Sequence, residues 1–229
     1  MGWRVLPLVV DEPAALLGQG VAALDALADD PTPTLRWYRA SSPALVLGRG
    51  QAPIVATPAL TVVTRSTGGG AVLMDSGLLS LDVLLPSGHP LLRGDVGAVF
   101  ARVGQAWGQA LTDLGIPDVT VHRAAATAQR RGTPRQQLLA AICYATLGRG
   151  EVLCRGRKLV GLAQRRRRPG ALVQCGLLRR WEPGLLLAAF GGDADDAEVI
   201  GHAAGLDELI DDAPHDETIM SAVRRRLAG

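Results

Sequence analysis

Lys158 has a side chain suited to contact a single oxygen atom, and it is the only lysine among the 24 basic residues of this 229-residue chain. A lysine ammonium is a compact charge with three hydrogen-bond donors, which suits one carbonyl or phosphate oxygen better than a guanidinium does. Composition alone leaves open that an arginine-biased chain has kept one lysine by chance. The surrounding sequence must therefore decide whether Lys158 has a chemical role.

The three cysteines are the next reactive groups. Cys143, Cys154 and Cys175 are odd in number, which argues against a disulfide framework. Neither they nor the four histidines have the spacing of metal ligands, so no metal site is expected. A free thiol is either a nucleophile or an inert buried side chain, and position alone leaves both possible for Cys143.

A run of three glycines provides a third signal, in the segment Thr64–Val72 that follows an expected strand. Consecutive glycines let the backbone approach a ligand closely and can present N–H groups to anionic oxygens. The spacing differs from that of a Walker loop or a dinucleotide fingerprint. A flexible turn is the simpler alternative.

Hydrophobic patterns predict the elements that position these residues. Helices are expected at residues 13–28, 94–115, 183–190, 195–202 and 215–228. Strands are expected at 34–40, 44–48, 61–65, 78–85, 119–122, 137–145, 151–154, 159–163 and 171–178, and a mobile loop at 124–136. Because helices and strands mix without regular alternation, the sequence predicts an α+β fold with a mixed or mostly antiparallel central sheet and flanking helices. Residues 1–229 are expected to form a single domain.

Composition and charge exclude several classes of protein. Hydrophobic residues make up 48% of the chain, but no apolar run approaches the roughly 20 residues that cross a bilayer. The start of the chain lacks the apolar stretch of a signal peptide, so a cytoplasmic protein without membrane contact is expected. No nucleic-acid-binding motif or aromatic platform is present, so nucleic acid is not an expected partner.

The basic residues are unevenly spread although the net charge is only +2. Arg165–Arg168 form the densest part of a basic run that begins at Arg155. Such a run is either a solvated face or a docking surface for an acidic partner or a phosphate, and the sequence leaves both open.

Four ordered blocks resemble the motifs of the lipoate-protein ligase and octanoyltransferase family. They are Gly48–Gln51, Arg65–Asp75, Gly156–Gln164 and Gln174–Leu178. The family motifs are Gly-Arg-x-Gln, Arg-Arg-x-[ST]-Gly-Gly-Gly-Ala-Val-x-His-Asp, Gly-Arg-Lys-[IV]-x-Gly-Ser-Ala and His-Gly-x-[IL]-Leu. The resemblance implies the biotin/lipoate-ligase-like catalytic fold. It also implies attachment of lipoyl or octanoyl groups to the target lysine of lipoyl domains.

The resemblance implies roles for individual residues. Lys158 matches the family's active-site lysine, whose ammonium would hold the acyl carbonyl or an acyl-adenylate phosphate. The loop Gly68–Ala71 would line the acyl and nucleotide pocket, and Gly161 and Ala163 would line the acyl channel. The full set of implied substrate-binding residues is Arg65, Thr67, Gly68, Gly69, Gly70, Ala71, Gly161, Ala163 and Gly176.

One branch of the family uses a catalytic cysteine fifteen positions before the active-site lysine. Cys143 stands at that spacing from Lys158, with Glu151 in matching register. By this resemblance the Cys143 thiolate takes octanoyl from an acyl-carrier-protein thioester and passes it to the lipoyl-domain lysine, without a cofactor. Cys154 and Cys175 are expected to be structural, with Cys175 facing the pocket.

Departures from the motifs keep two alternatives open. Thr64, Met74, Leu162 and Cys175 stand where the family pattern has arginine, histidine, serine and histidine. The glycine loop is closer to that of an ATP-dependent lipoate-protein ligase, which would need ATP and Mg²⁺. Many such ligases carry an accessory C-terminal domain, which is not expected here. The other alternative is a homologue that binds acyl groups or lipoyl domains without catalysis.

Both catalytic alternatives imply the same protein acceptors. These are the lipoyl domains of 2-oxoacid dehydrogenases and the H protein of the glycine cleavage system. The acyl donor is either octanoyl-acyl carrier protein or free lipoate. Since carrier proteins and many lipoyl domains are acidic, the arginine run would steer their association.

Overall fold

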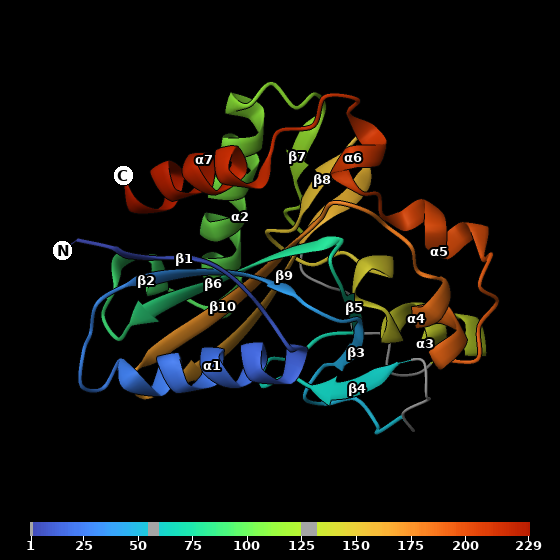
Figure 1. The fold of residues 1–229 in the computed structure, drawn as a ribbon, viewed down its shortest axis with the longest axis horizontal. Helices are drawn as coiled ribbons and strands as arrows, with labels where there is room; N and C mark the ends of the chain where they lie inside the picture. Colours follow the sequence, from blue (N-terminus) through green and yellow to red (C-terminus); the bar gives the residue numbers. More distant parts are fainter. Residues whose placement is uncertain (1, 55–59, 125–131) are drawn as a thin grey trace.

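The structure is a computed structural model that describes residues 2–54, 60–124 and 132–229 (Figure 1). Its strands are β1 (Arg4–Asp11), β2 (Thr34–Ala40), β3 (Ala44–Leu47), β4 (Thr61–Thr64), β5 (Val72–Met74), β6 (Leu78–Pro86), β7 (Val119–Val121), β8 (Val152–Cys154), β9 (Arg157–Arg167) and β10 (Gly170–Leu178). Its helices are α1 (Pro13–Ala26), α2 (Val96–Asp113), α3 (Pro134–Ala141), α4 (Gly184–Ala189), α5 (Ala197–His202), α6 (Leu206–Leu209) and α7 (Asp216–Ala228), with the short 3-10 helices η1 (Pro90–Leu92) and η2 (Cys143–Ala145).

Seven strands form the central sheet in the order β1-β2-β6-β10-β9-β8-β7. β1 is parallel to β2, and the other neighbouring pairs of this sheet are antiparallel. A smaller sheet has the order β4-β3-β5, in which β3 is parallel to β4 and antiparallel to β5. The predicted α+β fold with a mixed, mostly antiparallel sheet is therefore confirmed.

Helices cover both faces of the central sheet (Figure 1). On one face, α2 and α7 contribute Trp107 and Val223 to the main hydrophobic cluster, together with Trp37 of β2. On the other face, α1 packs Leu16 and Leu24 into two further clusters. Because both faces are covered, all nine residues of β6 are buried.

Most predicted elements lie within a few residues of those observed. β1 and β5 are not among the predicted strands, since β1 is a partly exposed edge strand and β5 has three residues. β9 is longer than predicted, because it continues into the arginine run. Residues 125–131 of the predicted loop lie outside the described residues.

The prediction of a strand at 137–145 is wrong. Pro134–Ala141 is helix α3, followed by η2. The helix begins at a capping box, in which the Thr133 hydroxyl accepts from the Gln136 N–H and the Gln136 side chain accepts from the Thr133 N–H. The hydrophobic periodicity of the short apolar run that follows is compatible with a strand or a helix. The capping box is therefore the signal that identifies a helix.

Three further findings concern only residues 2–54, 60–124 and 132–229. The cysteines are free thiols. No three His, Cys, Asp or Glu side chains gather there as metal ligands would. Within these ranges, no helix combines the length and apolar character that a membrane span requires.

Candidate active site

Lys158 follows the tight turn that joins β8 to β9. Arg155 and Gly156 have φ angles of 49° and 75°, as a two-residue hairpin turn of type I′ requires. Glycine adopts this conformation without the steric cost that other residues meet. The turn pairs Lys158 with Leu153 of β8, so the Gly-Arg-Lys motif determines where the ammonium enters the sheet.

The Lys158 side chain is 1% exposed, and its ammonium is surrounded by oxygen atoms. Nζ lies 2.6 Å from Oε1 of Glu151 and donates to the carbonyl oxygens of Cys143, at 2.7 Å, and Thr146, at 3.1 Å. Glu151 is held in turn by the N–H of Gly148, which donates to Oε2 at 2.6 Å. A buried ammonium needs such a counterion, because an unpaired charge at this depth is strongly destabilised.

Cys143 is the candidate nucleophile, and its sulfur lies beside the ammonium. Sγ is 3.8 Å from Nζ of Lys158, and the side chain is half-buried. The other two cysteines are buried in the core. Burial raises the pKa of the Cys175 thiol to about 12 and also raises the pKa of Cys154. The structure therefore brings the predicted pair together, and Cys143 is the least buried of the three thiols.

The glycine-rich loop supports the segment that carries Cys143. A Cβ atom at Gly70 would lie 2.7 Å from the backbone nitrogen of Cys143 and 2.9 Å from the carbonyl oxygen of Ala141. The N–H of Ala71 donates to that same Ala141 oxygen at 2.7 Å, and the Ala71 oxygen accepts from the Cys143 N–H at 2.9 Å. Only a residue without a side chain allows this approach, so the loop and Cys143 are positioned together.

Two long side chains hold these backbone segments. Arg65 is buried and donates to the carbonyl oxygens of Gly68, at 2.8 Å, and Gly70, at 2.7 Å. Burial lowers the pKa of its guanidinium. Gln51 donates from Nε2 to the carbonyl oxygen of Ala141 at 2.9 Å. The first motif of the sequence therefore reaches the same segment as the glycine loop.

Two cavities meet at Cys143. The narrow cavity, about 60 Å³, is mainly apolar, and the wide cavity has a volume of about 570 Å³. The residues common to both are Arg65, Cys143, Leu162 and Ala163. Tyr144 forms one wall of the narrow cavity, where its hydroxyl donates to the carbonyl oxygen of Gly176 at 2.7 Å. Burial raises the pKa of Tyr144, so its phenol remains a neutral donor.

Most predicted substrate-binding residues line these cavities. Gly161, Ala163 and Gly176 line the narrow cavity, and Gly68–Gly70 line the wide one. Cys175 faces the narrow cavity, as expected from the sequence. Thr67 and Ala71 are fully buried and line neither. Their contacts hold the loop.

Several residues at the site are not among those predicted to form it. Glu151, Tyr144 and Gln51 contact the reactive segment, and Gln164 lines the wide cavity. For Glu151, the spacing from Cys143 and Lys158 that matches the family was a sequence signal that it belongs to the site. For Gln51, the Gly-Arg-x-Gln block was also a signal. The contact of Tyr144 with Gly176 joins segments far apart in the chain, so no local pattern indicates it.

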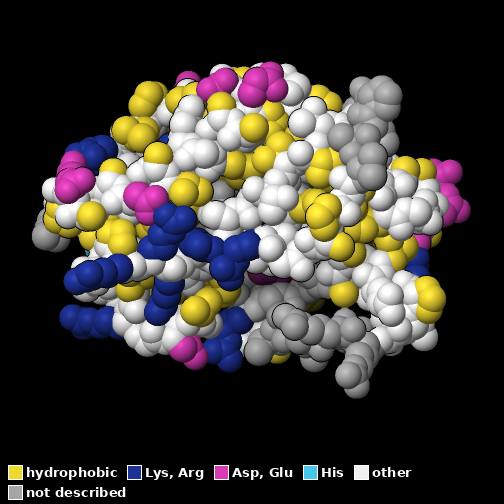
Figure 2. All heavy atoms as spheres, turned by 90° about the horizontal axis from the view of Figure 1, so that it is seen from below, with side chains coloured by type: hydrophobic (Ala, Val, Ile, Leu, Met, Phe, Trp, Pro, Cys, Tyr) yellow, Lys and Arg dark blue, Asp and Glu magenta, His cyan; other side chains and the backbone are white. Residues whose placement is uncertain are grey.

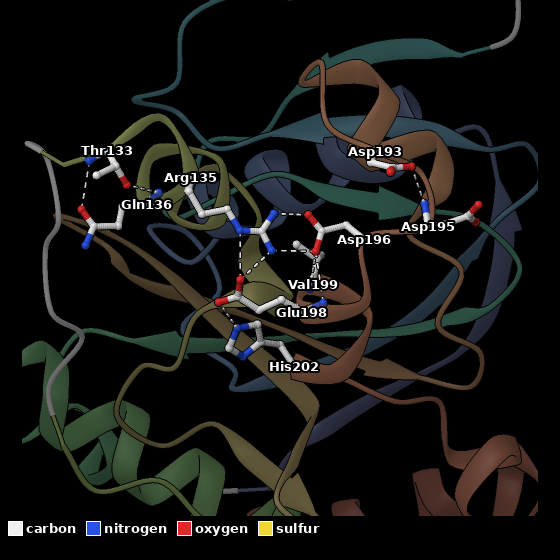
Figure 3. Close-up of polar contacts among 9 residues, drawn as sticks. All are labelled: Thr133, Arg135, Gln136, Asp193, Asp195, Asp196, Glu198, Val199 and His202. Atoms are coloured by element: carbon white, nitrogen blue, oxygen red, sulfur yellow. Dashed lines mark hydrogen bonds and ion pairs between the residues drawn. The ribbon is translucent and has the colours of Figure 1, made fainter.

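An ion-pair network fixes α3, which leads into Cys143, against α5 (Figure 3). Arg135 donates from Nε to Glu198 at 2.9 Å and from Nη2 to Asp196 at 2.6 Å. The chain after α5 returns to the other half of the site, where the N–H of Ala204 donates to the carbonyl oxygen of Lys158 at 3.2 Å. Helix α5 therefore connects the cysteine segment to the lysine strand.

Basic side chains gather beside a hollow on the face shown in Figure 2. Arg166, Arg167 and Arg168 are exposed at the end of β9. Arg166 donates to the backbone oxygen of Asp95 at 3.2 Å, and Asp95 lines the wide cavity. Arg166 thus lies at the rim of that cavity, whereas Arg167 forms an ion pair with Asp25 of α1.

Residues 20–198 match the family model of the lipoyl protein ligase A/B catalytic domain. The chain belongs to this family. A curated relative, the octanoyltransferase LipM of Moorella thermoacetica, is 32% identical over 182 residues, which cover 76% of this chain. The chain spans 63% of the length of that relative.

Solved structures share the fold. Lipoate-protein ligase A bound with ATP has a TM-score of 0.70 and 19% identity, covering 99% of this chain and 84% of that one. A bi-partite lipoate protein ligase from Thermoplasma acidophilum, described with its E2 lipoyl domain, has a TM-score of 0.66 and 19% identity, with 99% and 82% covered. Biotin protein ligase from Aquifex aeolicus has a TM-score of 0.54 and 13% identity, with 97% and 68% covered. The predicted biotin/lipoate-ligase-like fold is confirmed.

Proposed function

We propose that this protein transfers an octanoyl group from a carrier-protein thioester to the target lysine of a lipoyl domain through Cys143. One observation carries the proposal: the Cys143 sulfur lies 3.8 Å from the Lys158 ammonium, at the junction of the two cavities. The thioester arm reaches the sulfur through the wide cavity, and the acyl chain enters the narrow apolar one. The relative at 32% identity, named as an octanoyltransferase, supports the same activity.

Transfer occurs in two steps that leave the enzyme unchanged. The Cys143 sulfur attacks the thioester carbonyl carbon, the bond from that carbon to the carrier sulfur breaks, and the carrier thiol leaves with the proton of Cys143. The amine of the acceptor lysine then attacks the same carbonyl carbon, and the bond between that carbon and the Cys143 sulfur breaks. The product is an amide, and the proton of the amine returns to the thiol. This route consumes no cofactor.

Lys158 stabilises the negative charge that develops on the carbonyl oxygen during each step. Its three donors already contact protein oxygens, so contact with the acyl oxygen requires that one of them be exchanged. The Thr146 carbonyl is the longest of the three contacts, at 3.1 Å, and is the one we assign to be replaced.

An ATP-dependent ligase would need a place for Mg²⁺ near the same sulfur. Mg²⁺ prefers oxygen ligands, and Asp95 and Glu151 are the carboxylates that line the wide cavity in the described part of the chain. Asp95 caps α2 by accepting from the Ala98 N–H at 2.7 Å, and Glu151 is the counterion of Lys158. Both carboxylates already have a structural role in the protein, which supports the thioester route over one that uses a magnesium nucleotide.

The test combines purified protein with octanoyl-acyl carrier protein and an apo lipoyl domain. The lipoyl domain of a 2-oxoacid dehydrogenase and the glycine cleavage H protein are the acceptors to compare. We expect mass spectrometry to show an octanoyl adduct on Cys143, lost in Cys143→Ala and kept in Cys154→Ala. Normal transfer by Cys143→Ala would refute the proposal.

A parallel reaction with lipoate, ATP and Mg²⁺ examines the ligase alternative. Formation of lipoyl-adenylate, with no adduct on Cys143, would favour that alternative. Binding of the lipoyl domain without turnover in either reaction would indicate a homologue that has lost catalysis.

A further inference from the structure

Gln164 lines the wide cavity, and its side-chain amide lies just beneath the cavity wall without hydrogen-bond partners among the described residues. Its Nε2 and Oε1 atoms are both shielded from solvent, and neither has a partner in the described structure. The residue lines the same cavity as Cys143. An enclosed amide that forms no hydrogen bonds is costly, so its position indicates a ligand that supplies both an acceptor and a donor.

The strand geometry shows which side of the cavity Gln164 occupies. Side chains alternate along β9, so Gln164 shares a face with Leu162 and Arg166. Leu162 packs against the cluster that contains α2, and Arg166 contacts the backbone at Asp95, just before α2. Gln164 therefore lies on the α2 side of the wide cavity, next in the chain to Ala163, which lines both cavities.

The guanidinium of Arg149 also borders the wide cavity. A Cβ at Gly97 would lie 2.9 Å from its Nη1 atom. The guanidinium thus rests against the first turn of α2. The Asp95 carboxylate already caps the N-terminus of α2 at this end of the cavity, so Arg149 is the group there that suits a phosphate.

We infer that the Gln164 side chain turns into the wide cavity and binds an amide group of a pantetheine arm while the attached thioester reaches Cys143. This inference rests on the proposed function. In a pantetheine thioester, an ethylene group separates the sulfur from the first amide, so that amide remains inside the cavity when the carbonyl carbon meets Cys143. Pairing of two amides uses both free atoms of Gln164. The phosphate at the far end of the arm then lies toward Arg149.

The adenine edge of a nucleotide also offers an adjacent donor and acceptor. The pantetheine arm is the better match, because one cavity contains both the amide and the sulfur that the arm must reach. The carboxylates that a magnesium nucleotide would use are also engaged elsewhere.

The experiment compares two small donors in single-turnover acylation of Cys143, followed by mass spectrometry. Octanoyl-N-acetylcysteamine contains the amide, and an octanoyl alkyl thioester of similar length lacks it. For each donor, the acylation rate of Cys143 is divided by the rate at which the same donor acylates a free small-molecule thiol. This ratio corrects for the intrinsic reactivity of the thioester. We expect the wild-type protein to prefer the amide donor by about 10-fold, the size expected for two hydrogen bonds.

Gln164→Leu is expected to remove this preference by slowing only the amide donor. Gln109→Leu, on the exposed side of α2, is the matched control and keeps the preference. Equal wild-type rates for the two donors would overturn the inference, and this comparison does not depend on whether the variant folds. A Gln164→Leu variant that keeps the preference would overturn it as well.

Two other results separate this inference from the proposed function. No adduct on Cys143 with either donor or with octanoyl-carrier protein would overturn the proposed function, and the inference with it. If wild-type Cys143 is acylated but Gln164→Leu raises the Michaelis constant for ATP and leaves thioester rates unchanged, the amide contacts a nucleotide and the pantetheine inference is wrong.

Discussion

Lys158 and Glu151 form a buried ion pair, 2.6 Å apart, next to the reactive sulfur. Removing two charges from water is costly, and their attraction offsets this cost only with good geometry and further hydrogen bonds. Two carbonyl oxygens supply these bonds to Lys158. The pair therefore adds little net stability as a unit, whereas loss of one partner leaves an uncompensated buried charge.

Glu151→Ala should lower the free energy of unfolding by about 3 kcal/mol, because Lys158 loses its counterion. Urea unfolding followed by circular dichroism measures this. Glu182→Ala removes an exposed carboxylate and should change stability by less than about 0.5 kcal/mol. If both variants unfold at the same urea concentration, Glu151 is not the required counterion.

The three thiols should differ sharply in reactivity. Burial raises the pKa of Cys175 to about 12, so at pH 8 this thiol is almost entirely protonated and unreactive. Cys154 is buried as well, while Cys143 borders both cavities. Iodoacetamide at pH 8, followed by peptide mass spectrometry, should modify Cys143 first. Rapid labelling in Cys143→Ala would contradict this assignment.

At the scale of elements, three motifs converge on the segment of residues 141–143, where α3 ends and η2 begins. The glycine loop pairs with it, Gln51 reaches its backbone, and Lys158 in β9 binds the carbonyl oxygen of Cys143. Helix α5 joins it to β9 through Arg135 and Ala204. The position of Cys143 thus depends on backbone contacts that tolerate little displacement.

Gly70→Ala should reduce acyl transfer about 100-fold while the protein stays folded. The added Cβ would meet the backbone nitrogen of Cys143 at 2.7 Å, and a displacement of about 1 Å at a reacting group has an effect of this size. Gly50→Ala is the control, since no atom of the described residues lies within 4 Å of its added Cβ. Steady-state transfer rates and thermal melting test both variants. Equal rates would show that the close approach is unimportant.

At the scale of the whole molecule, charge is gathered beside the cavity mouth. Arg166 of β9 lies at the rim of the wide cavity, and basic side chains gather beside a hollow (Figure 2). A basic rim raises the encounter rate of an acidic protein partner without altering the chemistry inside. This effect weakens as salt screens the charges.

The double variant Arg166→Glu/Arg168→Glu should slow transfer from octanoyl-carrier protein about 10-fold at low salt. The effect should shrink at 0.5 M salt and be absent with a small uncharged thioester. Arg224→Glu/Arg225→Glu changes the net charge equally on the exposed side of α7 and is the control. An equal slowing by both double variants would refute a docking role for the rim.

Local pattern was sufficient for most of the elements. Residues 34–40 coincide with β2 as observed, and the apolar run at 78–85 is the fully buried β6. Residues 137–145 were assigned wrongly because a short apolar run fits either a buried strand or a buried helix. The Thr133–Gln136 capping box, a local signal, would have resolved it.

The sequence by itself determined the family and the fold class and indicated Cys143 as a partner of Lys158, because these depend on ordered motifs and on periodicity. Only the tertiary structure decided that Glu151 is the counterion, that Thr67 supports the loop, and that the Gln164 amide has no partner among residues 2–54, 60–124 and 132–229. These roles arise from contacts and burial between segments that lie apart in the chain. Spacing within one segment does not contain that information, and packing supplies it.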